Sequence, residues 1–321
     1  MAIELSVATS GLSVWFSNDI GETWDRPYSE SGLYLEARVW ALSSHPGEPE
    51  HLYAGTDSGI YRWDKVTQQW SHLSSPMDPL SVWSLAQAPH DPRLIIAGTQ
   101  PAALYLSKNS GESWEKLSAP LPNSCQFIGS PRVTHVSFDP VEHDRLWAGV
   151  EIGGVWTSDN NGQSWEARND GLISEDIHGL SISNNGTQRM FATTNKGLHV
   201  SDDAGTHWSF QHLDSPWQYC RVIAPRPDRK VLFLSNGNGP PGSNGRLLKS
   251  FDGGESWCDA HLPGTLNSTV WCLAMHESDP QLIFAATNLG QVFRSADGGE
   301  TWIKLNREFG EIRAITWRPT N

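Results

Sequence analysis

Long apolar stretches are missing from this sequence of 321 residues, and cysteine is scarce. No segment approaches the roughly 18 consecutive apolar residues that a membrane-spanning helix needs. The first residues carry no basic region ahead of an apolar one. We therefore expect no signal peptide, no membrane contact and a cytoplasmic location. The four cysteines show neither a CxxC motif nor metal-ligand spacing, which predicts free thiols and no metal site. They are Cys125, Cys220, Cys258 and Cys272.

Positive charge and catalytic signatures are scarce as well. The chain has 23 Lys and Arg residues against 36 Asp and Glu residues, a formal net charge of −13. Such a surface repels phosphate backbones, so nucleic acid is not an expected partner. A GxSxG elbow, an HExxH motif and a P-loop are absent, and no GxGxxG segment opens a helix, so we expect no cofactor. Helical periodicity of useful length is also absent, which indicates an all-β fold.

Tryptophan, in contrast, is abundant, with 16 residues in the chain. Seven of them end segments that approximate one pattern, Ser-x-Asp-x-Gly-x-x-Trp, at intervals of 43 to 51 residues: Trp24, Trp70, Trp114, Trp165, Trp208, Trp257 and Trp302. Each interval has room for four short strands bounded by turn residues, which is what one blade of a β-propeller needs. The sequence therefore predicts a single seven-bladed β-propeller domain over residues 1–321, with four antiparallel strands in each blade.

The two ends of the chain fit one shared blade. Too few residues precede Trp24 for a whole blade, and the segment EIRAITWRP near the C-terminus repeats the pattern of an innermost strand. We therefore expect residues 311–318 to complete the blade that holds residues 3–28, because this closure removes free sheet edges. The second copy of the pattern, around Asp64, lacks the serine and the glycine, so its hairpin is expected to be irregular.

The pattern Ser-x-Asp-x-Gly-x-x-Trp resembles the Asp-box, or BNR, repeat of sialidases, xyloglucanases, sortilin-type receptors and the photosystem II assembly propeller. The resemblance covers essentially the whole chain and implies the propeller fold. It implies little about activity, because the box is a turn device built on an Asp or Asn acceptor, a glycine with positive φ and a packed Trp. A sialidase is disfavoured, since those domains have six blades and their Arg-Ile-Pro signature is absent here. Xyloglucanases pair two propellers around a cleft, whereas this chain supplies one.

The innermost strands of a propeller line its central channel, where ligands usually bind. Aligning the seven predicted inner strands places these residues at one level: Trp40, Trp83, Thr134, His178, Arg221, Trp271 and Arg313. A second level, nearer the mouth, holds Arg38, Ser81, Arg132, Asp176, Tyr219, Thr269 and Glu311. Loops on this face carry Asp57 and Glu151, and the Gly/Pro-rich residues 236–245 are predicted to form a flexible rim or lid. His135 is offset by one residue from the aligned level, and we expect it to face between blades.

Two classes of function fit this set of residues. In the first, the chain is a hydrolase or lyase acting on a small anionic, carboxylated or sugar-like molecule. Its expected ligand-binding residues are Arg38, Trp40, Trp83, Arg132, Asp176, Arg221, Trp271 and Arg313. Its expected catalytic residues are His178 or Tyr219 for proton transfer, assisted by Glu151 or Asp57.

In the second class, the chain is a non-catalytic platform that binds a peptide or a partner protein. An enclosed pocket favours the enzyme, and an open basic patch favours the platform. A purely structural role is the remaining alternative, in which the arginines pair with neighbouring carboxylates and the tryptophans plug the channel.

Overall fold

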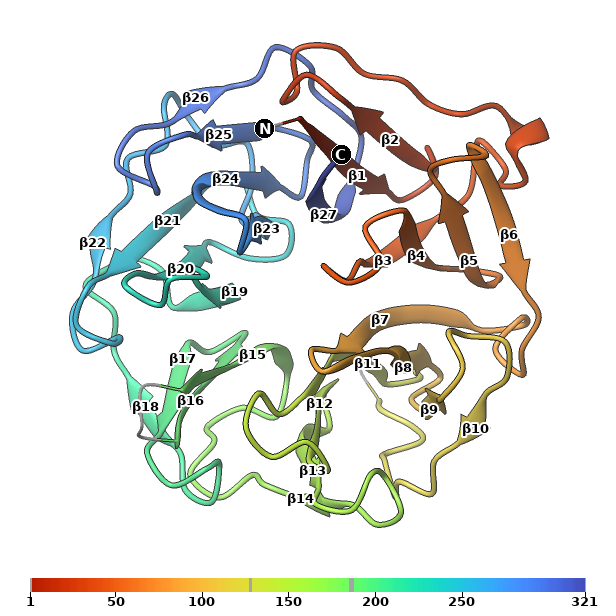
Figure 1. Cartoon of the computed structure of the whole chain (residues 1–321). Coiled ribbons are helices and arrows are strands. Elements are labelled where there is room, and N and C mark those ends of the chain that lie inside the picture. The colour runs from red at the N-terminus through yellow and green to blue at the C-terminus, as the bar shows by residue number, and fades with distance from the viewer. Residues whose placement is uncertain (1, 127–128, 185–187, 321) are drawn as a thin grey trace.

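The blades of the molecule surround a central channel, as the view in Figure 1 shows. The computed structural model describes residues 2–126, 129–184 and 188–320, whose regular structure is almost entirely β-strand. The single helical element in these ranges is the short 3-10 turn η1 (Ser29–Ser31), so they contain no helix long enough to span a bilayer. The predicted all-β fold is confirmed.

Six blades are four-stranded antiparallel sheets in which the chain runs from the innermost strand outward. The first three comprise β3 (Val39–Ser43), β4 (His51–Thr56), β5 (Gly59–Asp64) and β6 (Gln69–Leu73); β7 (Ser81–Ala88), β8 (Asp91–Gln100), β9 (Leu104–Ser107) and β10 (Glu115–Lys116); and β11 (Arg132–Phe138), β12 (Leu146–Glu151), β13 (Gly154–Ser158) and β14 (Glu166–Ala167). The next three comprise β15 (Ile177–Asn184), β16 (Gln188–Thr194), β17 (Leu198–Ser201) and β18 (Ser209–Gln211); β19 (Tyr219–Pro225), β20 (Leu232–Gly237), β21 (Gly245–Ser250) and β22 (Cys258–Asp259); and β23 (Val270–His276), β24 (Asp279–Thr287), β25 (Val292–Ser295) and β26 (Ile303–Lys304).

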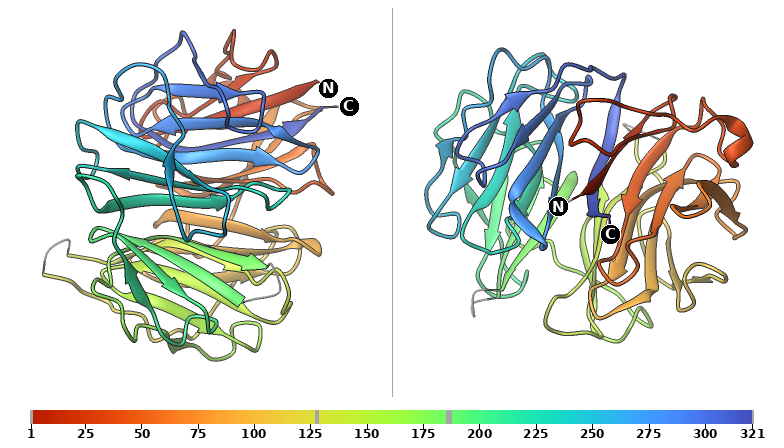
Figure 2. Two further views of the ribbon diagram at one scale, coloured as in Figure 1. Left: turned by 90° about the vertical axis from the view of Figure 1, so that its left-hand side faces the viewer. Right: turned by 45° about the horizontal axis from the view of Figure 1, so that its top comes forward.

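The seventh blade joins the two ends of the chain. β1 (Ile3–Thr9) lies between β2 (Val14–Ser17) and β27 (Ile312–Pro319), which takes the innermost position. A bridge between Phe16 and Asp25 marks the position of the fourth strand. The termini lie side by side in both views of Figure 2. The predicted seven-bladed ring and its closure by the C-terminal strand are therefore confirmed.

A buried ion pair links the two closing strands. Glu4 and Arg318 are direct partners in the register of β1 and β27, and Arg318 Nε donates to Glu4 Oε1 over 3.0 Å. Only 5% of Glu4 and 2% of Arg318 are exposed. Lys65, in the turn after β5, lies close enough to feel both charges: burial lowers the pKa of Lys65, Glu4 raises it and Arg318 lowers it. Ring closure thus rests on a charge pair as well as on backbone hydrogen bonds.

The repeated hairpins share one set of hydrogen bonds, which the first copy illustrates. Ser17 Oγ donates to Asp19 Oδ1 over 2.8 Å and accepts the Gly21 N–H over 2.9 Å. Hydrogen bonds from Thr23 lower the pKa of Asp19 to about 2. Trp24 Nε1 donates to the carbonyl of Gly21, which fixes the indole beneath the turn. The repeated residues therefore build the turn itself.

The second hairpin differs from the prediction. It is regular, since β5 and β6 pair over five positions, from Ile60↔Leu73 to Asp64↔Gln69. Asp64 Oδ1 accepts the Thr67 N–H over 2.8 Å and closes a turn of another kind. Loss of the serine and the glycine changes the turn type without breaking the strand pairing.

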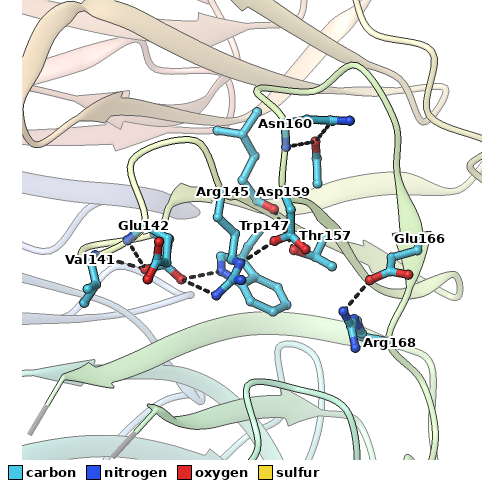
Figure 3. Close-up of polar contacts among 12 residues, drawn as sticks. Val141, Glu142, Arg145, Trp147, Thr157, Asp159, Asn160, Glu166 and Arg168 are labelled. Atoms are coloured by element: carbon cyan, nitrogen blue, oxygen red, sulfur yellow. Dashed lines mark hydrogen bonds and ion pairs between the residues drawn. The ribbon is translucent and has the colours of Figure 1, made fainter. Parts of the chain in front are cut away.

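A further polar network anchors the turn between β11 and β12. Asp139 is buried; its Oδ1 accepts the backbone N–H groups two and three residues further on, and its Oδ2 accepts Trp147 Nε1 over 3.0 Å. Figure 3 shows Arg145 beside Trp147 and paired with Asp159. Because Trp147 is only 1% exposed, Asp139 satisfies a donor that water cannot reach.

Candidate functional site

A break in strand pairing recurs at one level of all seven inner strands. At each break the inner strand has one residue more than its partner strand, which defines a β-bulge. The residues at the breaks are Trp40, Trp83, Thr134, His178, Arg221, Trp271 and Arg313. They are the same seven that sequence alignment placed at one level. Bulges re-aim side chains, so this ring of bulges gives the channel its distinctive lining.

Tryptophan and arginine side chains stack on one another in this ring. Trp40 and Trp83 lie face to face, with ring centroids 4.2 Å apart and planes 15° from parallel. Arg221 lies over Trp271 at 3.8 Å, and Arg313 is 5.1 to 5.6 Å from the centroids of all three indoles. Contacts of this kind hold guanidinium groups in partly desolvated positions.

The ring leaves a cavity of about 200 Å³ in the channel. Six of the twelve predicted site residues line it: Trp40, Trp83, His178, Arg221, Trp271 and Arg313. Thr134, His135, Gly179, Leu180, Val222 and Ile223 complete the lining. The three tryptophans therefore narrow the channel without filling it.

Two of the predicted arginines are neutralised by carboxylates of the chain. Arg132 Nη2 donates to Glu151 Oε1 over 2.7 Å, and Arg132 also lies 4.1 Å from the Trp83 ring centroid. Arg313 forms an ion pair with Glu311. Burial lowers the pKa of Arg313 to about 10, and the charges of Arg221 and Arg132 act in the same direction. The cluster is thus a site where positive charge is held at some energetic cost.

His178 is held by the neighbouring blade. Its Nδ1 lies 2.7 Å from the carbonyl oxygen of Cys220 and must donate there, which leaves Nε2 as the acceptor of the neutral ring. Nε2 lies 3.5 Å from Asp176 Oδ1, and the His178 ring is 4.9 Å from that of Tyr219. Burial raises the pKa of Tyr219, whereas the neighbouring Arg221 guanidinium lowers it.

Arg38 and Asp57 lie apart from the cavity lining. Both side chains are exposed at the mouth, where the Asp57 N–H donates to the Arg38 carbonyl and Arg38 forms a β-bridge with Ser10. Arg132, Asp176, Tyr219 and Glu151 occupy the intermediate position, in contact with lining residues but not lining the cavity themselves. The predicted residues therefore range from exposed positions at the mouth to positions that line the cavity.

His135 corrects the sequence-based expectation. It lines the cavity instead of facing between blades, because the pairing break between Val133 and His135 changes the alternation of the strand. Burial lowers the pKa of His135 to about 4, so the ring is neutral at physiological pH. Predicting the direction of His135 would have required knowing that a bulge precedes it, and a single sequence carries no marker for a bulge.

The predicted lid over residues 236–245 is fastened in place. Thr269 N–H donates to the Pro241 carbonyl over 2.9 Å, and Thr269 Oγ1 donates to the Gly239 carbonyl over 2.9 Å. Asn238 Oδ1 accepts the N–H groups of Ser243 and Asn244. The loop is a structured part of the rim. The loop at 119–132 includes residues 127–128, which lie outside the described ranges.

Another large cavity lacks the predicted site residues. It has a volume of about 470 Å³ and lies near the opposite ends of the inner strands, beside Pro140, Pro225 and Phe251, and none of the predicted site residues lines it. Across the described ranges, no three His, Cys, Asp or Glu side chains are arranged to hold a metal ion.

Comparison with known proteins supports the fold. No family model matches the chain. A probable oligoxyloglucan-reducing end-specific xyloglucanase of Neosartorya fischeri is 23% identical over 82% of this chain, which spans only 39% of that protein. The GH74 xyloglucanase structure from Xanthomonas campestris superposes with a TM-score of 0.66 at 23% identity, over 83% of this chain and 45% of that one. Ycf48 bound to D1 peptide gives a TM-score of 0.63 at 17% identity, over 95% and 90% of the two chains. At these identities the shared property is the propeller architecture.

Proposed function

We propose that this propeller binds a small anionic or sugar-like molecule in the central cavity and acts on it as a hydrolase or lyase. The observation that supports this most is the convergence of His178, Arg221 and Arg313 on one cavity that three indoles flank. The similarity to xyloglucanases favours a hydrolase acting on a sugar-related compound. The repeated turn geometry also supports assigning the hairpins to the Asp-box, or BNR, type.

The size of the cavity limits the substrate. A volume of about 200 Å³ equals six or seven water molecules at ~30 Å³ each, which suits one sugar ring. A polysaccharide chain would not fit within it. Carboxylates are absent from the residues that line the cavity, whereas glycosidases mostly use two carboxyl groups flanking the scissile bond. The chemistry that fits is elimination beside a carboxylate, or hydrolysis of an ester or lactone.

Each role follows from a contact in the channel. The Cys220 carbonyl fixes the tautomer of His178, so that Nε2 can take a proton from substrate or water. Arg221 holds the anionic group, and the protonated His178 returns its proton to the leaving oxygen. Tyr219 lies beside His178, outside the lining, and stays protonated because burial raises its pKa. Asp176 stabilises the imidazolium that forms, since it lies 3.5 Å from His178 Nε2.

A panel of sugar acids, esters and lactones tests this proposal. Replacing His178 by Ala is expected to lower kcat by roughly 10²-fold or more while leaving substrate binding almost intact, because a general base acts mainly in the transition state. The matched control is His212→Ala, which removes an exposed histidine away from the cavity. Equal turnover by His178→Ala and the wild type would contradict the catalytic role.

A non-catalytic platform is the second candidate. The similarity to Ycf48 bound to D1 peptide covers most of both chains, unlike the similarity to the xyloglucanases. Tyr28 and Tyr34, with 76% and 72% of their surfaces exposed, offer aromatic contacts on the segment before β3. Tight binding of a peptide that Tyr34→Ala abolishes, together with no turnover of any panel compound, would favour the platform over the enzyme.

A further inference from the structure

The arginines in and around the channel differ in what balances their charge. Glu151 pairs with Arg132, and Glu311 pairs with Arg313. Arg221 makes no ion pair with a carboxylate anywhere in ranges 2–126, 129–184 and 188–320, although it lines the cavity. Arg38 also lacks such a pair, but it lies exposed at the mouth. The cavity lining therefore contains one guanidinium that makes no ion pair, and an anionic group of a ligand could bind it.

The position of Arg221 limits the shape of that negative group. Trp271 covers one face of its guanidinium at 3.8 Å, so new contacts must come through the N–H groups at the edge of the plane. An edge with two parallel N–H groups matches the two oxygens of a carboxylate. A phosphate ester would bring up to two negative charges to a single guanidinium, in a cluster that already holds the Asp176 carboxylate. A carboxylate is thus the better match.

An uncharged polar side chain of the cavity, His135, lies on β11, two blades away from Arg221. The His135 side chain has no hydrogen bond within the described residues, and burial keeps it uncharged by lowering its pKa to about 4. A neutral imidazole offers one N–H donor and one acceptor, a pair that a hydroxyl group can satisfy. Neighbouring Thr134 cannot serve in this way, because its hydroxyl contacts the carbonyls of Gly149 and Ile177.

Building on the proposed function, we infer that the ligand is a monosaccharide-sized hydroxycarboxylic acid whose carboxylate binds Arg221 and whose hydroxyl group binds His135. Uronic and aldonic acids are the class with this chemistry. A single ring fits the volume of about 200 Å³. Arg221 then selects the acid over its neutral analogue, and His135 selects a hydroxylated ring over an apolar one.

Isothermal titration of the full chain with matched probes tests both selections. The probes are glucuronate, galacturonate, mannuronate and gluconate, each beside its amide, with cyclohexanecarboxylate as the acid without hydroxyl groups and glucose 6-sulfate as another monoanion. We expect the best acid to bind at least tenfold more tightly than its amide and than the sulfate. Arg221→Gln is expected to remove the preference for acid over amide, a loss of roughly tenfold to a hundredfold. Arg93→Gln, at an exposed arginine on β8, is the matched control.

The His135 selection needs its own pair of variants. His135→Leu is expected to remove most of the preference for the sugar acid over cyclohexanecarboxylate, whereas His135→Asn keeps part of it because the amide still donates and accepts. Unchanged melting temperatures show that the variants are folded.

The outcomes separate this inference from the proposed function. Equal binding of acids and amides, a preference for the sulfate, or undiminished selectivity in Arg221→Gln overturns the inference while leaving a ligand site in the cavity. Binding of none of these acids, with turnover of another small molecule that depends on His178, also overturns the inference alone. If no small molecule binds or reacts, both fall.

Discussion

Replacing Glu4 by Gln is expected to destabilise the propeller more than replacing Arg318 by Met. Removing one partner of a buried ion pair leaves the other charge uncompensated and costs about 3–5 kcal/mol. Lys65 makes the two losses unequal, because it lies near both groups and carries a positive charge. Without Arg318, Lys65 still offsets Glu4. Without Glu4, Lys65 adds to the repulsion on a buried arginine.

The expected losses are therefore about 3 kcal/mol for Arg318→Met and about 4–5 kcal/mol for Glu4→Gln. Against a typical total stability of ~5–15 kcal/mol, either loss is large. At this size each kcal/mol corresponds to roughly 2–4 °C in Tm. The double variant is expected to be no less stable than Glu4→Gln alone, since it carries no isolated charge at the closing strands.

Urea unfolding followed by tryptophan fluorescence measures these differences, once refolding has been shown to recover the signal. Arg93→Met is the control, because it removes an exposed ion pair, which contributes little to stability. Losses within about 1 kcal/mol of that control for both single variants would refute the role of the pair in ring closure. A greater loss for Arg318→Met than for Glu4→Gln would refute the compensation by Lys65.

Three further predictions concern the hairpins and turns. Ile20 has a φ of 55° at the position where two other copies of the hairpin have Gly253 and Gly298. Because a non-glycine residue is strained at positive φ, Ile20→Gly is expected to stabilise the protein by up to about 1 kcal/mol. A lower urea midpoint for the variant would contradict this. Asp139→Ala leaves the buried Nε–H of Trp147 without an acceptor and is expected to cost about 2–4 kcal/mol; a loss below ~1 kcal/mol by urea unfolding would show that water or a neighbour replaces the carboxylate. The pKa of His207 is raised by its hydrogen bond to Asp203 and by the charge of Asp170, so the stabilisation by this contact is complete below the ordinary histidine pKa and is lost as pH rises through the raised value. An NMR titration is expected to show a lower His207 pKa in Asp170→Asn than in the wild type, and an unchanged value would contradict the assignment.

The fold could be predicted because its signal is repeated and local. Trp24 and Trp302 belong to the same kind of hairpin as the tryptophans between them, and their spacing sets the number of blades. Turn hydrogen bonds such as those of Ser17 and Asp19 form between near neighbours in the chain, so the pattern carries them without tertiary information. The hairpin around Asp64 was wrongly predicted to be irregular. Loss of the serine and the glycine rules out the turn that the other copies form, but other turn types can still join the two strands.

The sequence by itself determined the propeller, its closure and the level at which seven channel residues meet. Only the tertiary structure decided the charge balance, because Arg132 faces Glu151 across the β11–β12 pair, whereas Arg221 stacks on an indole from the next blade. It also decided the direction of His135, since a pairing break shifts strand alternation and leaves no mark in a single sequence. Backbone periodicity is a property of neighbouring residues. Partnership in the channel depends on side chains that the ring brings together from different blades.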